Sequence, residues 1–312
     1  MTIPRLEVVQ RTGSTNTDLL EMAGADPAAW PHLSVLLARE QTAGKGRAGR
    51  TWQSGDLWAL TFSVVLRPRV DRQRWGWIPL VAGLAVVRTL RATIAAAGGG
   101  AGAGERIGLK WPNDIVDVHA GAEYVDGWGT MRKLGGILTE VMADGEGVVV
   151  GIGVNLAGSE LPVAHAGTLA ASGIVPPGPG TEARRATVAR QGTEPGPGPE
   201  TGGGVGSGRE SGTDRQTEAD QQWAEAMMRA IVTQMGELLT DLQVPGPTAR
   251  AVEQVCVSIG APVQADLPDG TPVRGVAQRL APDGALVVHT HGGPQVIRAG
   301  DIRHLRAPAA LD

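Results

Sequence analysis

The hydrophobic pattern of the first half of the chain alternates between helix and strand periods. It predicts helices over residues 16–23 and 79–97. It predicts strands over residues 35–38, 60–66, 107–111, 136–141 and 148–154. The last two strands flank Asp144-Gly145, a dipeptide typical of a hairpin turn. Ser14 or Thr15 stands before the first helix, where a hydroxyl can cap exposed backbone amides.

The second half begins with the clearest helical pattern of the chain, over residues 217–242. Six large apolar residues recur there at spacings of three or four, which predicts one buried face: Trp223, Met227, Ile231, Met235, Leu238 and Leu242. The remaining residues switch to short strands separated by Asp269-Gly270, Asp283-Gly284 and Gly292-Gly293. Three such turns predict a small, SH3-like β-barrel.

Between these halves the composition changes sharply. Residues 176–216 are rich in Pro and Gly and hold few large aliphatic side chains, so we expect this insertion to be disordered. Four regions follow: a catalytic core of mixed α/β (α+β) architecture over 1–175, the insertion over 176–216, a helical segment over 217–250 that completes the core domain, and a C-terminal β module over 251–312.

Composition narrows the classes of function. Hydrophobic residues make up 42% and charged residues 19% of the chain, with a net charge of −4, so a nucleotide must be bound by a local basic cluster rather than a global field. Cys256 is the single cysteine, which excludes an intrachain disulfide and favours a reducing compartment. We find neither a signal peptide nor a stretch approaching the roughly 20 apolar residues of a membrane span. A cytoplasmic protein is therefore expected.

Residues 44–50 read Gly-Lys-Gly-Arg-Ala-Gly-Arg and carry the most chemical information. The spacing of Gly44, Gly46 and Gly49 matches a dinucleotide-binding fingerprint, and Asp71 follows at about the distance of a ribose-binding acid. That motif must open directly into a helix, however, and residues 51–56 are a poor helix start. A Walker A loop is excluded because Gly46 follows Lys45 where Ser or Thr is required.

Interleaved glycines and cations suit a different task. Glycines let the backbone wrap closely around a ligand, and the cations can hold a carboxylate beside a triphosphate, two anions that otherwise repel. Such a loop would stabilise charge that develops at the α-phosphorus. The alternative is a solvated basic surface loop.

Four further segments complete a recognisable set: Ser14-Thr15-Asn16, Lys110-Trp111-Pro112-Asn113-Asp114, Lys133-Leu134-Gly135-Gly136-Ile137-Leu138 and Gly151-Ile152-Gly153-Val154-Asn155. In this order, with the basic loop after the first, they resemble the biotin protein ligases. The resemblance covers roughly residues 14–155. It implies a mixed-sheet domain of the class II aminoacyl-tRNA synthetase/biotin ligase type, which joins biotin to ATP as biotinyl-5'-AMP and passes biotin to a lysine of a biotin carboxyl carrier domain.

The resemblance also implies roles for individual residues. Biotin would be bound by Ser14, Thr15, Asn16, Gln41, Lys45, Gly46, Arg47 and Lys133. ATP would be bound by Arg50, Trp52, Asn113, Asp114 and Asn155, with Mg²⁺ entering on the ATP phosphates near Asp114. The catalytic residues would be Lys133, Arg47 and Arg50. Trp111 would form either an apolar wall of the site or part of the core, and Asp114 could instead orient Lys133 or the incoming amine.

Some features depart from the family pattern or leave alternatives open. The family loop commonly reads Gly-Arg-Gly-Arg-Arg-Gly-Arg, whereas this chain has Lys45 and Ala48, and Lys lacks the bidentate fork of Arg. Too few residues precede Ser14 for an N-terminal DNA-binding module, so DNA is not an expected partner. No membrane partner is expected, and the protein would be a monomer or homodimer. The rivals are a lipoate-protein ligase or octanoyltransferase of the same fold and a non-catalytic regulator that binds biotinyl-AMP.

Overall fold

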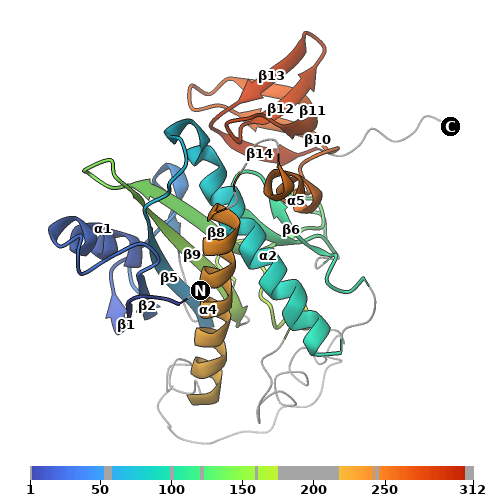
Figure 1. Ribbon diagram of the computed structural model, residues 1–312. Coiled ribbons are helices and arrows are strands. Elements are labelled where there is room, and N and C mark those ends of the chain that lie inside the picture. The colour runs from blue at the N-terminus through green and yellow to red at the C-terminus, as the bar shows by residue number, and fades with distance from the viewer. Residues whose placement is uncertain are drawn as a thin grey trace, which may run out of the picture.

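A seven-stranded mixed sheet forms the centre of the molecule (Figure 1). The computed structural model describes residues 2–52, 58–98, 102–119, 123–158, 161–174, 218–240, 242 and 246–305. The strands lie in the order β1-β2-β5-β9-β8-β7-β6. Their bounds are β1 (Leu6–Thr12), β2 (Val35–Gln41), β5 (Trp58–Leu66), β9 (Val148–Ala157), β8 (Arg132–Val141), β7 (Asp114–Asp117) and β6 (Ile107–Lys110). β1 and β2 are parallel and the other neighbours are antiparallel, which confirms the predicted mixed α/β class.

The two faces of the sheet are covered by different helices. Helix α1 (Thr15–Ala25) packs on one face, where Leu19 lies in a buried cluster with Val65 and Val149. Helices α2 (Ile78–Ala96) and α4 (Glu218–Thr240) lie against each other on the opposite face, where Val64 and Val150 belong to the main core (Figure 1). Adjacent strand residues point to opposite faces, so each buried strand serves both layers.

Helix α2 corrects one expectation from the sequence. The stretch Arg72–Ala96 is long and apolar enough to cross a membrane by length and composition, contrary to the expectation that no segment qualifies. Most of it is buried inside the protein, however, and Leu80 and Leu90 are completely inaccessible to solvent. Packing between the sheet and α4 explains its apolar pattern without a membrane.

The segment after the insertion holds two helices rather than the one predicted. Helix α4 agrees with the predicted helix to within two residues at each end, and Ile231 and Met235 of its apolar stripe are completely buried. A second helix, α5 (Pro247–Val255), begins with Pro247 in its first turn after Gly246. A proline at that position lacks only an N–H that a helix start leaves unused. Residues 176–216, predicted to be disordered, lie outside the described residues.

The C-terminal residues form a separate five-stranded antiparallel sheet, where the sequence predicts a small β-barrel. Its order is β13-β12-β11-β10-β14. Its strands are β10 (Pro262–Asp266), β11 (Pro272–Leu280), β12 (Leu286–Thr290), β13 (Gly293–Ile297) and β14 (Asp301–His304). The predicted turns occur where expected, between β10 and β11, between β11 and β12, and at the junction of β12 and β13. Strand β14 is the edge that reaches the larger domain, because His304 bridges to Gly127.

Candidate active site

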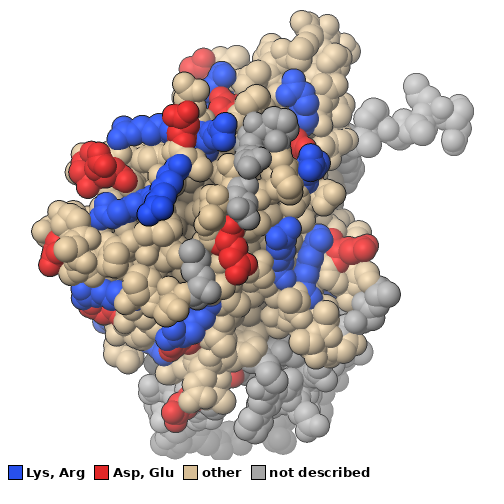
Figure 2. All heavy atoms as spheres, in the orientation of Figure 1, with Lys and Arg blue, Asp and Glu red and all other residues tan. Residues whose placement is uncertain are grey.

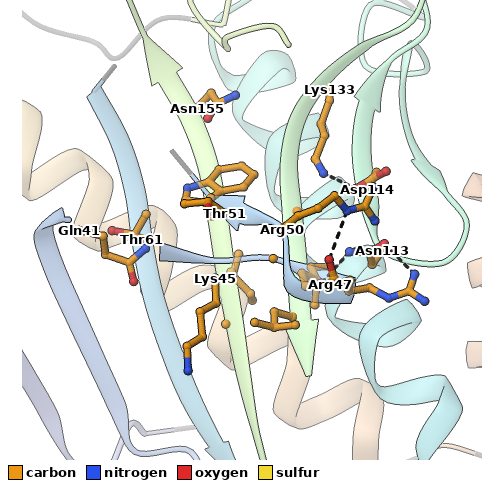
Figure 3. A pocket seen from close by; sticks show the side chains of 18 of the residues that line it. Gln41, Lys45, Arg47, Arg50, Thr51, Thr61, Asn113, Asp114, Lys133 and Asn155 are labelled. Atoms are coloured by element: carbon orange, nitrogen blue, oxygen red, sulfur yellow. Dashed lines mark hydrogen bonds and ion pairs between the residues drawn. The ribbon is translucent and has the colours of Figure 1, made fainter. Parts of the chain in front are cut away.

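One cavity of about 270 Å³ brings together the residues that the sequence singles out. Its lining includes every predicted site residue: Ser14, Thr15, Asn16, Gln41, Lys45, Gly46, Arg47, Arg50, Trp52, Asn113, Asp114, Lys133 and Asn155. Figure 3 shows that the residues it labels come from several strands and from the loop after β2. The cavity lies on the α1 face of the large sheet.

Glycines on the sheet make room for the cavity. Gly151 and Gly153 of β9 share a face with Val149, and a Cβ on Gly151 would lie 2.4 Å from Oδ1 of Asn16. A Cβ on Gly153 would lie 2.7 Å from the Trp52 ring. Because side chains alternate along a strand, this Gly-x-Gly spacing bares one face of the sheet while Ile152 fills the core on the other. The glycines of the predicted Gly151-to-Asn155 motif therefore form the floor of the cavity.

Neutral polar groups form one end of the cavity. The backbone N–H and hydroxyl of Thr15 both donate to Oε1 of Gln41, at 2.8 and 3.0 Å. Ser63 Oγ lies 2.6 Å from Oδ1 of Asn16, and the Asn16 amide donates to Glu140 at 2.8 Å. These bonds fix the orientation of both amides. Such an end suits a neutral ligand group that both donates and accepts hydrogen bonds.

The proposed capping role of this segment is wrong. Ser14 occupies the N-cap position of α1 with extended backbone, but its side chain makes no capping hydrogen bond. The Thr15 hydroxyl is used across the sheet, where it meets Gln41 and Ser63. All three residues from Ser14 to Asn16 are buried. Their polar groups therefore serve the cavity rather than the helix end.

The basic loop is a short hairpin, not the start of a helix. Strand β3 (Gly44–Lys45) pairs with β4 (Thr51–Trp52), and the Gly46 N–H donates to the Arg50 carbonyl at 2.7 Å. A Cβ on Gly44 would lie 2.6 Å from the Trp52 carbonyl oxygen, which explains the glycine there. The dinucleotide-binding alternative, which needs a helix directly after the loop, fails on this geometry.

Two arginines of the hairpin are fixed by different neighbours. Arg47 donates to Oδ1 of Asn113 at 3.3 Å, and Asn113 is itself held by mutual hydrogen bonds with Ile137 (Figure 3). Burial lowers the pKa of Arg47, with Asp301 and Asp114 acting in the opposite direction, but a guanidinium stays protonated. Arg50 is exposed and pairs with Asp301 of β14 at 2.7 Å. Lys45 is also exposed and points away from Lys133 in Figure 3.

Lys133 and Asp114 form the most buried ion pair of the cavity, with Nζ 2.5 Å from Oδ1. Burial raises the pKa of Asp114, but Lys133 and then Lys110 outweigh it and hold that pKa below its ordinary value. Asp114 is therefore ionised at neutral pH. The Lys133 ammonium also lies 5.7 Å from the centre of the Trp52 ring. The Lys133 ammonium thus has the Asp114 carboxylate and the Trp52 ring as neighbours.

The two tryptophans considered for the site have different positions. Trp52 lines the cavity, and its Nε1 is buried without a hydrogen-bond partner. Trp111 is buried in the core, where its Nε1 donates to the Gly284 carbonyl at 3.1 Å, and it does not line the cavity. Asn155 lines the cavity but donates its amide to the Gly167 carbonyl at 3.0 Å. Trp52 is therefore part of the cavity wall, and of the two alternatives for Trp111 the structure shows the core position.

Sequence reasoning missed several lining residues. Trp128 and His165 stack at 4.2 Å with an interplanar angle of 7° and form one wall. Burial lowers the pKa of His165 to about 4, so its ring is neutral at pH 7. Thr61, on β5, lines the cavity beside Gln41. Only Thr61 carried a signal, because it shares a strand face with Ser63; the other two come from irregular segments.

The described residues contain no group of three or more His, Cys, Asp or Glu side chains that could hold a metal ion. Mg²⁺ is commonly bound by one or two carboxylates together with substrate phosphates. Asp114 is the carboxylate of the cavity lining. On the face shown in Figure 2, acidic and basic side chains are interspersed.

Comparisons with known proteins agree on one family. Residues 8–156 match the model of the biotin/lipoate A/B protein ligase family. The chain is 32% identical to a biotin–[acetyl-CoA-carboxylase] ligase of Mycobacterium tuberculosis over 97% of this chain and 90% of that protein. It is 37% identical to a ligase of the same name from Paracoccus denitrificans, over 49% of this chain and 55% of that one.

The fold is that of solved members. A biotin protein ligase from Aquifex aeolicus in complex with biotin and ATP matches with a TM-score of 0.61 at 20% identity, covering 97% of this chain and all of that one. The full-length sequence similarity and this shared fold agree with the resemblance seen in the five motifs. The chain belongs to the biotin protein ligases, within the biotin/lipoate A/B protein ligase family.

Proposed function

We propose that this protein attaches biotin to a lysine of a biotin carboxyl carrier domain, using ATP and forming biotinyl-5'-AMP. One observation carries the proposal: a group of neutral hydrogen-bonding side chains and a group of cations line a single cavity. The neutral group suits the ureido ring of biotin, and the cations suit a carboxylate beside phosphates. The full-length relative from Mycobacterium tuberculosis bears the name of this activity.

The first step joins two anions. A biotin carboxylate oxygen attacks the α-phosphorus of Mg-ATP, a P–O bond forms, and pyrophosphate leaves with the electrons of the broken bond. Lys133 would neutralise the carboxylate and the α-phosphate, and Arg47 and Arg50, which also line the cavity, would extend the positive charge along the loop. Cations fixed before the reaction stabilise the charge of the transition state without reorganising.

Substrate placement follows from the walls of the cavity. Ser14, Thr15, Asn16 and Gln41 would hold the ureido head, with Gly46 and Lys45 along the biotin chain. Trp52 would give the nucleotide an apolar wall, and Asn113, Asp114 and Asn155 would lie nearer its phosphates and Mg²⁺. The hairpin of residues 44–52 would then cover the mixed anhydride and exclude water.

The second step transfers biotin directly to an amine. The neutral amine of the carrier lysine attacks the biotinyl carbonyl, and an amide C–N bond forms as the acyl C–O bond of the anhydride breaks. AMP leaves with the electrons of that bond, and the amine loses a proton to solvent. A thioester route through the enzyme finds no support, because Cys256 is buried outside the cavity lining. Burial raises the pKa of its thiol to about 11, so it is protonated at neutral pH. This also argues against an octanoyltransferase that works through a cysteine.

Exchange of pyrophosphate into ATP tests the first step. We expect exchange that depends on biotin and not on lipoate, because the head pocket offers hydrogen bonds that a dithiolane ring cannot use. Exchange supported by lipoate alone would replace this proposal with a lipoate-protein ligase. Lys133→Ala serves as the site control, and full exchange by that variant would show that the cavity is not the active site.

A further inference from the structure

Lys110 belongs to a motif of the family but has no place in the steps above. It ends β6, directly across from Asp114 in the antiparallel register with β7. Only 3% of the residue is exposed, and it is absent from the cavity lining. Opposite residues of an antiparallel pair put their side chains on the same face. Lys110 therefore lies beside Asp114 on the same face of the sheet, without lining the cavity.

Three groups surround the Lys110 ammonium. It donates a hydrogen bond to the carbonyl of Ile302, on β14 of the C-terminal sheet. It also lies 4.2 Å from the centre of the Trp128 ring, in a cation–π arrangement. Burial lowers the pKa of Lys110, and Asp114 raises it. A carbonyl, an aromatic face and a carboxylate all favour the charged amine and offset part of the cost of burying it, while burial keeps its pKa below the ordinary value.

The charges of Lys133, Asp114 and Lys110 together determine how strongly Lys133 attracts a substrate carboxylate. Lys133 and Asp114 alone form a neutral pair, because the ammonium lies 2.5 Å from the carboxylate. A neutral pair attracts a substrate carboxylate only weakly. Lys110 adds a second cation to the same carboxylate, and the group of three then carries a net charge of +1. Lys133 and Asp114 line the cavity and Lys110 does not, so a ligand meets the excess positive charge at Lys133.

We propose that Lys110 is a positioning residue that acts as the counter-ion of Asp114 and thereby leaves the charge of Lys133 available to the carboxylate of biotin. This rests on the proposed function. The competing explanation is purely structural, namely that Lys110 joins β6 to the C-terminal sheet through Ile302. The two differ in one respect: a counter-ion acts on charged ligands alone, whereas a structural link affects all ligands of the cavity.

Binding of biotin and of biotinol, the alcohol without the carboxylate, separates the two explanations. Calorimetry on the full chain without ATP would compare the wild type with Lys110→Met and with Lys110→Gln, which keeps a donor for Ile302. We expect biotin affinity to fall about tenfold in both variants, the effect of one charge at roughly 10 Å and an effective dielectric constant of about 20. Biotinol affinity should stay within about twofold.

A second pair of variants tests the role of Asp114 in the same assay. Asp114→Asn alone should bind biotin at least as tightly as the wild type, because it releases Lys133. Adding it to Lys110→Met should restore biotin affinity, because the net charge returns to +1. Equal losses for biotin and biotinol, unchanged biotin affinity in the Lys110 variants, or no restoration in the double variant would each overturn the inference. A wild-type protein that binds no biotin would instead refute the proposed function.

Discussion

Replacing Gly151 by Ala should displace the Asn16 side chain and remove its amide from the neutral end of the cavity. The added Cβ would lie 2.4 Å from Oδ1 and 3.0 Å from Cγ of Asn16, so the side chain must move by about 1 Å to reach ordinary contact. That movement breaks its hydrogen bonds to Ser63 at 2.6 Å and to Glu140 at 2.8 Å. Each bond contributes about 0.5–1.5 kcal/mol, and the donor to Glu140 is strengthened by charge.

The expected result is a loss of biotin affinity of about 5- to 150-fold, because two bonds totalling about 1–3 kcal/mol are lost and the amide is misplaced. Calorimetric titration with biotin would measure it, and a thermal melt would report folding. Gly24→Ala is the matched control, because it lies in the same helix as Asn16 and nothing stands within 4 Å of its added Cβ. We expect the control to bind biotin normally and to melt slightly higher, since Ala favours helix over Gly.

A Gly151→Ala variant with normal biotin affinity would contradict this expectation. Biotin would then not use the Asn16 amide, and the neutral end would belong to another ligand. Equal losses in Gly151→Ala and Gly24→Ala would show instead that the effect comes from helix α1 as a whole. The contrast between the two glycines therefore isolates the Asn16 contact.

Three further outcomes follow from the structure. Asp301→Asn should lower the KM for ATP by up to about threefold, because Asp301 competes with the phosphates for Arg50. The Tm should change little, because an exposed ion pair adds only about 0–1 kcal/mol to stability. A raised KM would mean that the pair orients Arg50 instead. His304→Gln should flatten the fall in stability between pH 6.5 and 5. Burial lowers the pKa of His304 to about 4, so the unfolded chain binds the proton first and about 2 kcal/mol is lost over that range in the wild type; identical melts of both proteins at pH 5 and 7 would contradict this. Cys256→Ala should keep the wild-type rate of carrier labelling, and loss of that rate without loss of folding would implicate the thiol.

The sequence predicts what depends on local pattern. The stripe from Trp223 to Leu238 has a clear helical period, and α4 follows it closely. The turns at Asp269-Gly270 and Asp283-Gly284 fall between strands as predicted. Strand β1 was missed because it is a half-exposed edge with polar residues, and β7 because its four residues, Asp114–Asp117, follow a proline turn. Short strands draw their stability from neighbours that the local sequence does not contain.

The site was predicted as a set of residues, but its arrangement was not. The sequence motifs assign Ser14 and Lys133 to the same site, and both residues line the cavity. The contact of Arg50 with Asp301 spans 251 positions of the sequence, and that of Lys110 with Ile302 spans 192 positions. No spacing rule reaches that far. The walls formed by Trp128 and His165 come from irregular segments without periodicity, and only the folded chain shows them together.

The most direct test of the central claim is the transfer of biotin to a carrier domain, followed by intact mass. The full chain would be mixed with Mg-ATP, biotin and a biotin carboxyl carrier domain, with a carrier whose target lysine is replaced by arginine as the control. We expect one added biotinyl group on the carrier, release of AMP and pyrophosphate, no labelling of the arginine control and little labelling by Lys133→Ala. An unmodified carrier under these conditions, or one modified by lipoate in place of biotin, would contradict it.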